Sequence, residues 1–213
     1  MKRKDYSKIT LSSQQIDAGE HKQHLGGGAR YWDRRGAFQL ALLQWLGLDR
    51  YDTLLDVGCG PLRGGIHFIK FLERGNYWGV DFNASFIEAA HRFVQAEHVP
   101  SASSHVLELN DFNFAKLHRT FDFILCFSVL NHCDDLERKL FFERIPTVMT
   151  KSTKLLVTHA SWFRAQDFAS SFLELKRSFS SETELATHLK FQDWGFDGPG
   201  DRLPILELCL ADG

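Results

Sequence analysis

The sequence predicts a doubly wound α/β fold, with a mostly parallel sheet and helices on both of its faces. Three observations support this prediction. Short strand-like segments alternate with helix-like segments of about 12 residues, which is the pattern of βαβ units. A glycine-rich loop directly follows the first strand-like segment. The most apolar run of the chain, Phe121–Phe127, has the composition of a central strand buried on both faces.

The N-terminal part of the chain differs in composition from the remainder. Residues 1–35 are polar and contain the run Gly26–Gly28, so we expect an N-terminal arm ahead of one domain over residues 36–213. An amphipathic helix is expected at Ala37–Leu46, and Gly47 ends it.

In the first half of the domain, the spacing of apolar residues alternates between the strand and the helix period. In chain order this predicts a strand at Thr53–Val57, a helix at Leu62–Glu73, a strand at Tyr77–Val80, a helix at Ala84–Glu97 and a strand at His105–Leu109. The helix at Ala84–Glu97 carries apolar side chains at helical spacing, namely Phe86, Ile87, Ala90 and Phe93.

In the second half, the central strand is followed by acids that favour a helix start. The elements expected there are a helix at Leu136–Val148, a strand at Lys154–Thr158, helices at Asp167–Phe179 and Glu182–Leu189, and a strand at Leu203–Leu210. The turn-rich run Gly198–Asp201 separates the last helix from the last strand.

Composition excludes several classes of protein. With 213 residues, 44% of them apolar and 24% charged, the chain can form a globular domain with a hydrophobic core. It has no apolar run near the roughly 20 residues of a membrane span and no signal peptide, so we expect a cytoplasmic protein that enters no membrane. A net charge of -2 disfavours a broad nucleic-acid-binding face. The four cysteines lack zinc-like spacing, and no metal site is expected.

The loop after the first strand reads DVGCGPLRGG over residues 56–65. Gly58 and Gly60 permit a tight turn and the close approach of a ligand to the backbone. Nicotinamide and flavin domains also use such loops. However, Leu62 stands where a pyrophosphate binder has glycine. The carboxylate of Asp56 would repel a pyrophosphate and attract a ligand that carries an ammonium and a sulfonium group.

Two further acids follow the next two strands. Asp81 comes about 20 residues after Gly60, the spacing at which an acid receives ribose hydroxyls, and Asp111 could accept from an adenine amino group. Each acid also has a structural alternative. Asp56 could cap a helix or bind a buried lysine, Asp81 with Asn83 could cap the next helix, and Asp111 could form an Asx turn. Together, on successive strand ends, the acids favour an adenosyl ligand.

The stretch Leu54–Ala90, LLDVGCGPLRGGIHFIKFLERGNYWGVDFNASFIEAA, resembles the first half of a class I methyltransferase, an enzyme that uses S-adenosylmethionine. It is similar in particular to small bacterial methyltransferases with an LRGG sequence after the glycine loop. The resemblance extends from Gly26–Trp32 to about Ala160. It implies a seven-stranded sheet with one antiparallel strand and S-adenosylmethionine over the first four strand ends.

The resemblance also implies roles for single residues. The loop Asp56–Gly60 would hold the methionine part of the cofactor, Asp81 would hold the ribose, and Phe82 would pack on the adenine. Asp111 and the backbone of Phe112 would read the adenine edge. The cofactor-binding residues expected on this basis are Asp56, Gly58, Cys59, Gly60, Arg63, Asp81, Phe82, Asp111, Phe112, Phe127 and Ser128.

Two histidines are candidates for the catalysis of methyl transfer. In related methyltransferases the segment after the fourth strand runs beneath the sulfonium, which places His132 as a base that takes a proton from the acceptor. His159 ends the fifth strand and is expected on the same side. The alternative is that either histidine only satisfies a backbone group in a loop.

The N-terminal arm could close over the cofactor as a lid, or pack as a helix outside the sheet. The arm and Ser161–Ser181 would form the acceptor pocket.

These observations favour an enzyme that methylates oxygen or nitrogen of a small molecule. One alternative is a methyltransferase that acts on RNA or another nucleic acid, which the near-neutral charge disfavours. A second is an inactive methyltransferase-like binding protein, which the intact loop and acids disfavour. A nicotinamide-dependent oxidoreductase is a weaker alternative, because of Asp56 and Leu62.

Overall fold

The computed structural model describes residues 5–25, 28–100, 103–158, 173–179, 189, 194 and 205–211. The strands are β1 (Leu54–Val57), β2 (Tyr77–Asp81), β3 (Ser104–Glu108), β4 (Phe121–Cys126), β5 (Met149–Thr158), β6 (Leu173–Phe179) and β7 (Ile205–Leu210). The α-helices are α1 (Ser13–Asp17), α2 (Trp32–Trp45), α3 (Gly65–Phe71), α4 (Ala84–Ala96) and α5 (Asp135–Arg144). Short 3₁₀ helices include η1 (Tyr6–Lys8), η2 (Glu20–His24), η3 (Ala29–Tyr31), η5 (Phe114–Leu117), η6 (Leu130–His132) and η7 (Ile145–Val148).

All seven strands belong to one sheet, in the order β3-β2-β1-β4-β5-β7-β6. The pairs from β3 through β5 are parallel, and β7 runs antiparallel to both β5 and β6. The predicted doubly wound, seven-stranded sheet with one antiparallel strand is therefore confirmed. The strand order reverses between β1 and β4, and such sheets bind ligands at the carboxyl ends of the strands beside that point.

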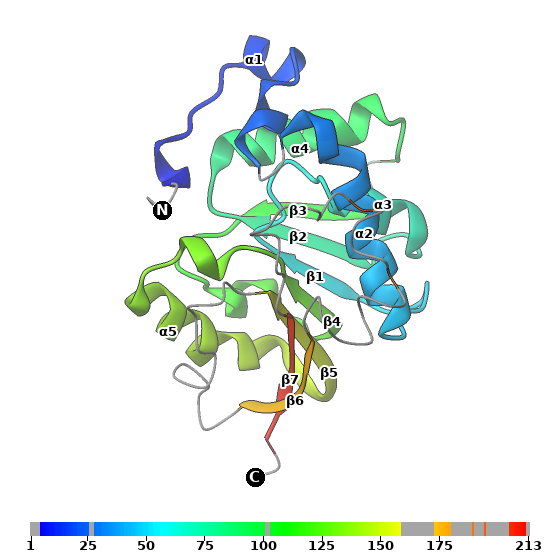
Figure 1. Cartoon of the computed structure of the whole chain (residues 1–213), viewed down its shortest axis with the longest axis vertical. Helices are drawn as coiled ribbons and strands as arrows, with labels where there is room; N and C mark the ends of the chain where they lie inside the picture. Colours follow the sequence, from blue (N-terminus) through cyan, green and yellow to red (C-terminus); the bar gives the residue numbers. More distant parts are fainter. Residues whose placement is uncertain are drawn as a thin grey trace.

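Each face of the sheet carries its own hydrophobic core. On one face α2, α3 and α4 pack through side chains such as Phe38, Phe68 and Ile87. On the other face, η5 and α5 contribute Phe114 and Phe141. Figure 1 shows these two groups of helices on opposite sides of the strands. Strands β1 and β4 contribute buried side chains to both cores, so their carboxyl ends are held between the two layers of helices.

Strand β6 corrects the prediction of a helix over Asp167–Phe179, since Leu173–Phe179 is a strand. Leucine and charged residues alternate there, which also fits a strand, and β7 supplies the ladder hydrogen bonds and an ion pair of 2.7 Å between Arg177 and Glu207. This long-range pairing outweighs the local helical preference. The rest of that predicted helix lies outside the described residues, as does the predicted helix at Glu182–Leu189 except for its last residue.

Several boundaries also differ from those expected. Helix α2 begins at Trp32, so residue 35, where the arm was expected to end, lies inside this helix. Helix α5 begins after Asp134, whose side chain and that of Glu137 form a capping box. Its predicted C-terminal part is the 3₁₀ helix η7, because Pro146 cannot continue an α-helix. Among the described residues, no helix is long and apolar enough to span a membrane.

Candidate functional site

The glycine loop turns sharply at the carboxyl end of β1. Gly58 and Gly60 adopt φ angles of 72° and 53°, which favour glycine. The N–H groups of Gly58 and Cys59 donate to the carbonyl of Val80, at 2.7 and 3.1 Å. A Cβ on Gly58 would lie 2.2 Å from Cγ2 of Val129. The segment after β4 therefore packs directly against the loop, and only glycine at this position allows that packing.

The two glycines of the LRGG sequence allow close packing beneath the loop. A Cβ on Gly64 would lie 2.3 Å from Oε1 of Gln39 in α2, and one on Gly65 would lie 2.4 Å from the hydroxyl of Tyr77 in β2. Leu62 is buried with a φ of 64°, a conformation that costs a non-glycine residue about 1–2 kcal/mol. Because these two glycines have no Cβ, Gln39 of α2 and the hydroxyl of Tyr77 can pack directly against the loop.

Asp56, in β1, is buried below the loop. Its Oδ2 accepts a hydrogen bond of 2.8 Å from the Tyr77 hydroxyl, so its partner is neither a helix end nor a lysine. Burial raises the pKa of Asp56 to about 7, the nearby Asp81 also raises it, and the bond from Tyr77 opposes both effects. The site thus holds a carboxyl group that titrates near neutrality.

Asp81 ends β2 on the other side of the loop. Its Oδ2 accepts from the N–H of Gly60 at 3.0 Å, and its Oδ1 accepts from the N–H of Asn83 at 2.9 Å. Burial raises the pKa of Asp81, and these N–H groups oppose that shift. It is Asn83 that caps α4, by accepting from the N–H of Phe86 at 3.2 Å. The next residue after Asp81, Phe82, is 47% exposed.

The turn after β3 lies beside Asp81, because the N–H of Leu109 donates to the Asp81 carbonyl at 2.9 Å. Asp111 and Phe112 both have left-handed φ angles, 56° and 50°. Two such non-glycine residues in a row are unusual, and conformations of this kind gather at functional sites. The guanidinium of Arg144 donates to the Asp111 carbonyl and holds the turn. Asp111 itself is exposed.

The segment after β4 carries the remaining candidates. Ser128 adopts a φ of 60°, and its N–H donates to Oγ1 of Thr158 at 2.6 Å. The half-buried ring of Phe127 meets Phe38 edge-on, with 6.3 Å between the centroids. His132 ends η6, and its imidazole meets the ring of Tyr6 from the arm, with centroids 4.7 Å apart and planes at 79°.

The arm crosses this end of the sheet. The side-chain amide of Asn83 donates to the carbonyls of both Tyr6 and Ile9, at 2.9 Å each. The N–H of Leu11 donates to Oγ of Ser85 at 3.1 Å. Farther along the arm, Leu25 lies beside the backbone of Gly60. The described part of the arm therefore contacts the loop, the start of α4 and the segment after β4.

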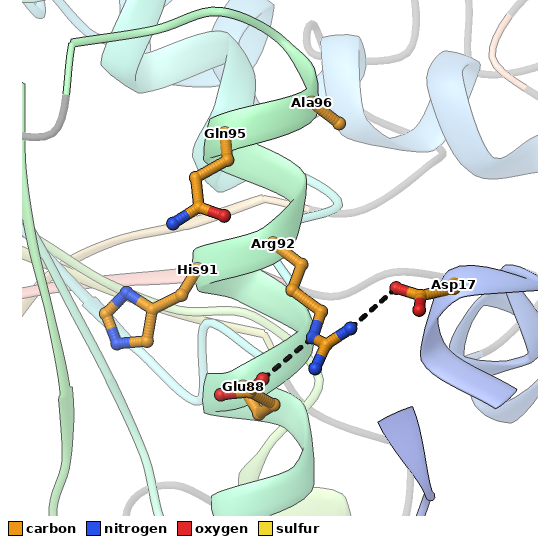
Figure 2. Close-up of a pocket in the computed structure, with 6 residues that line it drawn as sticks. All are labelled: Asp17, Glu88, His91, Arg92, Gln95 and Ala96. Carbon is orange, nitrogen blue, oxygen red and sulfur yellow. Dashed lines mark hydrogen bonds and ion pairs between the residues drawn. The ribbon is translucent and has the colours of Figure 1, made fainter. Parts of the chain in front are cut away.

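In the second half of α4, Arg92 attaches α1 to this helix through an ion pair. Figure 2 shows Arg92 of α4 between Glu88 and Asp17 in a polar surface hollow. Arg92 lies 2.7 Å from a carboxylate oxygen of each, and it also donates to Oγ of Ser13 at 2.9 Å. The arm is thus attached to α4 at two separate places, Asn83 and Arg92.

Two of the predicted cofactor-binding residues, Cys59 and Arg63, have buried side chains. Burial raises the pKa of the Cys59 thiol, so this side chain is neutral packing beneath the loop. Arg63 is buried, and burial lowers its pKa to about 10, with a further lowering from the like charge of Arg35. All four cysteines are buried and none forms a disulfide. His159 lies outside the described residues.

The predicted residues after β1, β2, β3 and β4 gather at one end of the sheet. Sequence reasoning missed three of their contacts. Tyr77 could have been suspected, because a buried tyrosine needs a partner for its hydroxyl. The sequence indicates Asn83 only as a helix cap, although it also holds the arm. No pattern in the sequence points to Tyr6 as a neighbour of His132.

Comparisons with known proteins find a matching domain and similar folds. Residues 55–151 match the family model described as a methyltransferase domain. No curated protein matches the sequence. Among solved structures, the chain resembles magnesium protoporphyrin IX methyltransferase from Synechocystis PCC 6803 with bound S-adenosylmethionine, at 14% identity and a TM-score of 0.58, over 95% of this chain and 100% of that one.

Two further similar structures are a mitomycin 7-O-methyltransferase and a glycopeptide N-methyltransferase in complex with sinefungin. The first has 17% identity and a TM-score of 0.61, over 93% of this chain and 60% of that one. The second has 12% identity and a TM-score of 0.57, over 84% of this chain and 94% of that one. Residues 55–151 therefore match a methyltransferase domain, and the chain shares the fold of solved methyltransferases, one of which holds bound S-adenosylmethionine.

Proposed function

We propose that this protein transfers the methyl group of S-adenosylmethionine to an oxygen or nitrogen atom of a small-molecule acceptor. The observation that carries the proposal is the pair of buried acids, Asp56 and Asp81, on either side of a glycine loop where the strand order reverses. Carboxylates there favour a cationic ligand with ribose hydroxyls. The similar structures include an O- and an N-methyltransferase, and a net charge of -2 disfavours nucleic acid.

We assign each part of the site to a part of the cofactor. In this proposal the loop Asp56–Gly60 receives the methionine part, together with Arg63. Asp81 accepts from the ribose hydroxyls with the lone pairs that its backbone donors leave open. The exposed ring of Phe82 packs on the adenine, and Asp111 with the backbone of Phe112 binds the adenine edge. Phe127 and Ser128 lie beneath the sulfonium.

We assign the proton transfer to His132, with His159 as the second candidate. The bound cofactor supplies an activated methyl group, and the protein's main task is to align the acceptor and exclude water. The imidazole of His132 takes the proton that the acceptor atom loses as its bond to the methyl group forms. In the same proposal the arm is a lid, because it is attached over the strand ends.

Cofactor binding is tested by titration calorimetry with S-adenosylhomocysteine, and NAD serves as the control ligand. We expect S-adenosylhomocysteine alone to bind. Asp81→Ala should weaken its binding by about 2–4 kcal/mol, because charge-assisted hydrogen bonds are lost. Asp122→Ala, at the amino end of β4, should not change it. Binding of NAD without S-adenosylhomocysteine, or full affinity in a folded Asp81→Ala variant, would contradict the assignment.

The role of His132 is tested after a screen of small hydroxyl and amine compounds has identified an acceptor. His132→Ala should keep its affinity for S-adenosylhomocysteine and lower turnover by about 10²–10⁴-fold, the usual contribution of a general base. In the wild type, kcat/KM should fall below about pH 6.5, where histidines become protonated. His91→Ala, on the exposed side of α4, is the matched control. Full turnover and an unchanged pH profile in His132→Ala would show a structural role.

A further inference from the structure

Tyr6 is a half-buried tyrosine that the arm brings into the proposed methyl-transfer site. Its ring meets the imidazole of His132 edge-on at 4.7 Å and the ring of Phe86 at 6.1 Å. One neighbour follows β4, where the acceptor is expected, and the other lies in the first turn of α4, next to the cofactor acid of β2. The ring of Tyr6 therefore lies between the segment after β4, where the acceptor is expected, and the start of α4, beside the expected cofactor.

The backbone and the hydroxyl of Tyr6 are both held in place. Asn83 binds its carbonyl at 2.9 Å, and the hydroxyl lies 3.4 Å from the carbonyl of His24, its acceptor at the other end of the arm. Burial raises the pKa of Tyr6, the charge of Arg63 opposes this shift, and Asp81 adds to it. The hydroxyl is thus neutral and lies within electrostatic range of two predicted cofactor-binding residues.

His132 needs such a neighbour if it acts as a base. Its backbone is fixed, since its N–H donates to the carbonyl of Val129 at 2.8 Å. That bond does not set the direction of the imidazole, which turns about two side-chain torsions. A general base must point at the proton it removes, and small misplacements cost large factors in rate. A ring packed against the imidazole restricts both torsions.

We infer that Tyr6 is a positioning residue for methyl transfer: its ring orients the imidazole of His132 and covers the acceptor side of the site when the arm is in place. The inference rests on the proposed function. It gives the arm a second task, because the docked arm completes the geometry of the base as well as covering the cofactor. The part that matters is the aromatic ring, since the hydroxyl bonds to the arm's own backbone.

The contact itself can be tested without an acceptor. NMR can follow the His132 ring protons in the full chain, assigned with His132→Ala, as ring currents shift protons that lie against an aromatic face. Tyr6→Leu should move these resonances, and Tyr6→Phe should leave them nearly in place. Tyr51→Leu, a change at a tyrosine that is 71% exposed, is the matched control and should have no effect. Unmoved resonances in folded Tyr6→Leu, or equal movement in Tyr6→Phe, would overturn the inference.

The consequence for catalysis is tested with an acceptor that the wild type methylates. Tyr6→Leu should lower kcat by roughly ten- to a hundredfold, while its Kd for S-adenosylhomocysteine stays within about twofold. Tyr6→Phe should restore most of the lost rate. A weaker Kd with unchanged kcat would show that Tyr6 only covers the cofactor, and would overturn the inference. Failure of the wild type to bind S-adenosylhomocysteine would instead refute the proposed function, whereas the NMR result would still report the ring contact.

Discussion

At the scale of single residues, the most informative group is the carboxyl of Asp56. Its pKa is raised from the ordinary 3.8 to about 7, first by burial and then by the charge of Asp81. An unfolded chain releases this proton near pH 4, so the unliganded protein loses stability as pH rises from about 4 through 7. A cation bound beside Asp56 would stabilise its ionised form. The charge of this carboxyl group would therefore change when such a ligand binds.

This linkage predicts that cofactor affinity depends on pH. Affinity for S-adenosylmethionine should increase from pH 6 to pH 8 and binding near pH 7 should release protons, because the cationic ligand favours ionised Asp56. Calorimetry in buffers of different ionisation enthalpy measures both effects. Asp56→Asn, which keeps the shape of the side chain, should remove most of the dependence. An affinity that is constant over this range in the wild type would show that Asp56 does not sense the ligand's charge.

At the scale of elements, the N-terminal arm is attached to α4 at two places. Asn83 joins the first turn of α4 to the backbone of η1, and Arg92 joins a later turn of α4 to α1. Asn83 also donates its N–H to Asp81, so one residue contacts both the arm and a predicted cofactor acid. The bonds of Asn83 to the arm are part-buried and those of Arg92 are exposed, so the arm is easier to detach than the fully paired central strands of the sheet.

The two attachment points predict a way to loosen the arm without touching the glycine loop. Arg92→Ala should speed amide exchange of residues 5–25 and increase the dissociation rate of S-adenosylhomocysteine, while the core strands keep their protection. Arg50→Ala removes a comparable exposed ion pair, with Glu73, and is the control. Faster exchange with an unchanged dissociation rate would argue that the arm is not a lid.

At the scale of the whole molecule, the local βαβ units could be predicted from the sequence. The spacing of apolar residues located β1 to β5 and their helices, and the glycine loop with its acids predicts which end of the sheet binds the cofactor. Strand β6 could not be found in this way, because its local sequence is compatible with a helix as well as a strand, and only its pairing with β7 decides between the two. The contacts of Tyr77 with Asp56 and of Tyr6 with His132 were missed as well, because they depend on which segments the sheet brings together.

The position of β7 has a consequence for the order in which the chain can fold during synthesis. This strand is made after every other described strand, yet it lies between β5 and β6. Strands β1 to β5 can pair as they emerge from the ribosome, but β6 is left without a neighbour until β7 inserts beside it. Its unpaired backbone is exposed during that interval, which favours association with other chains. The edge of the sheet farthest from the proposed cofactor site is therefore the part of a nascent chain most open to misassembly.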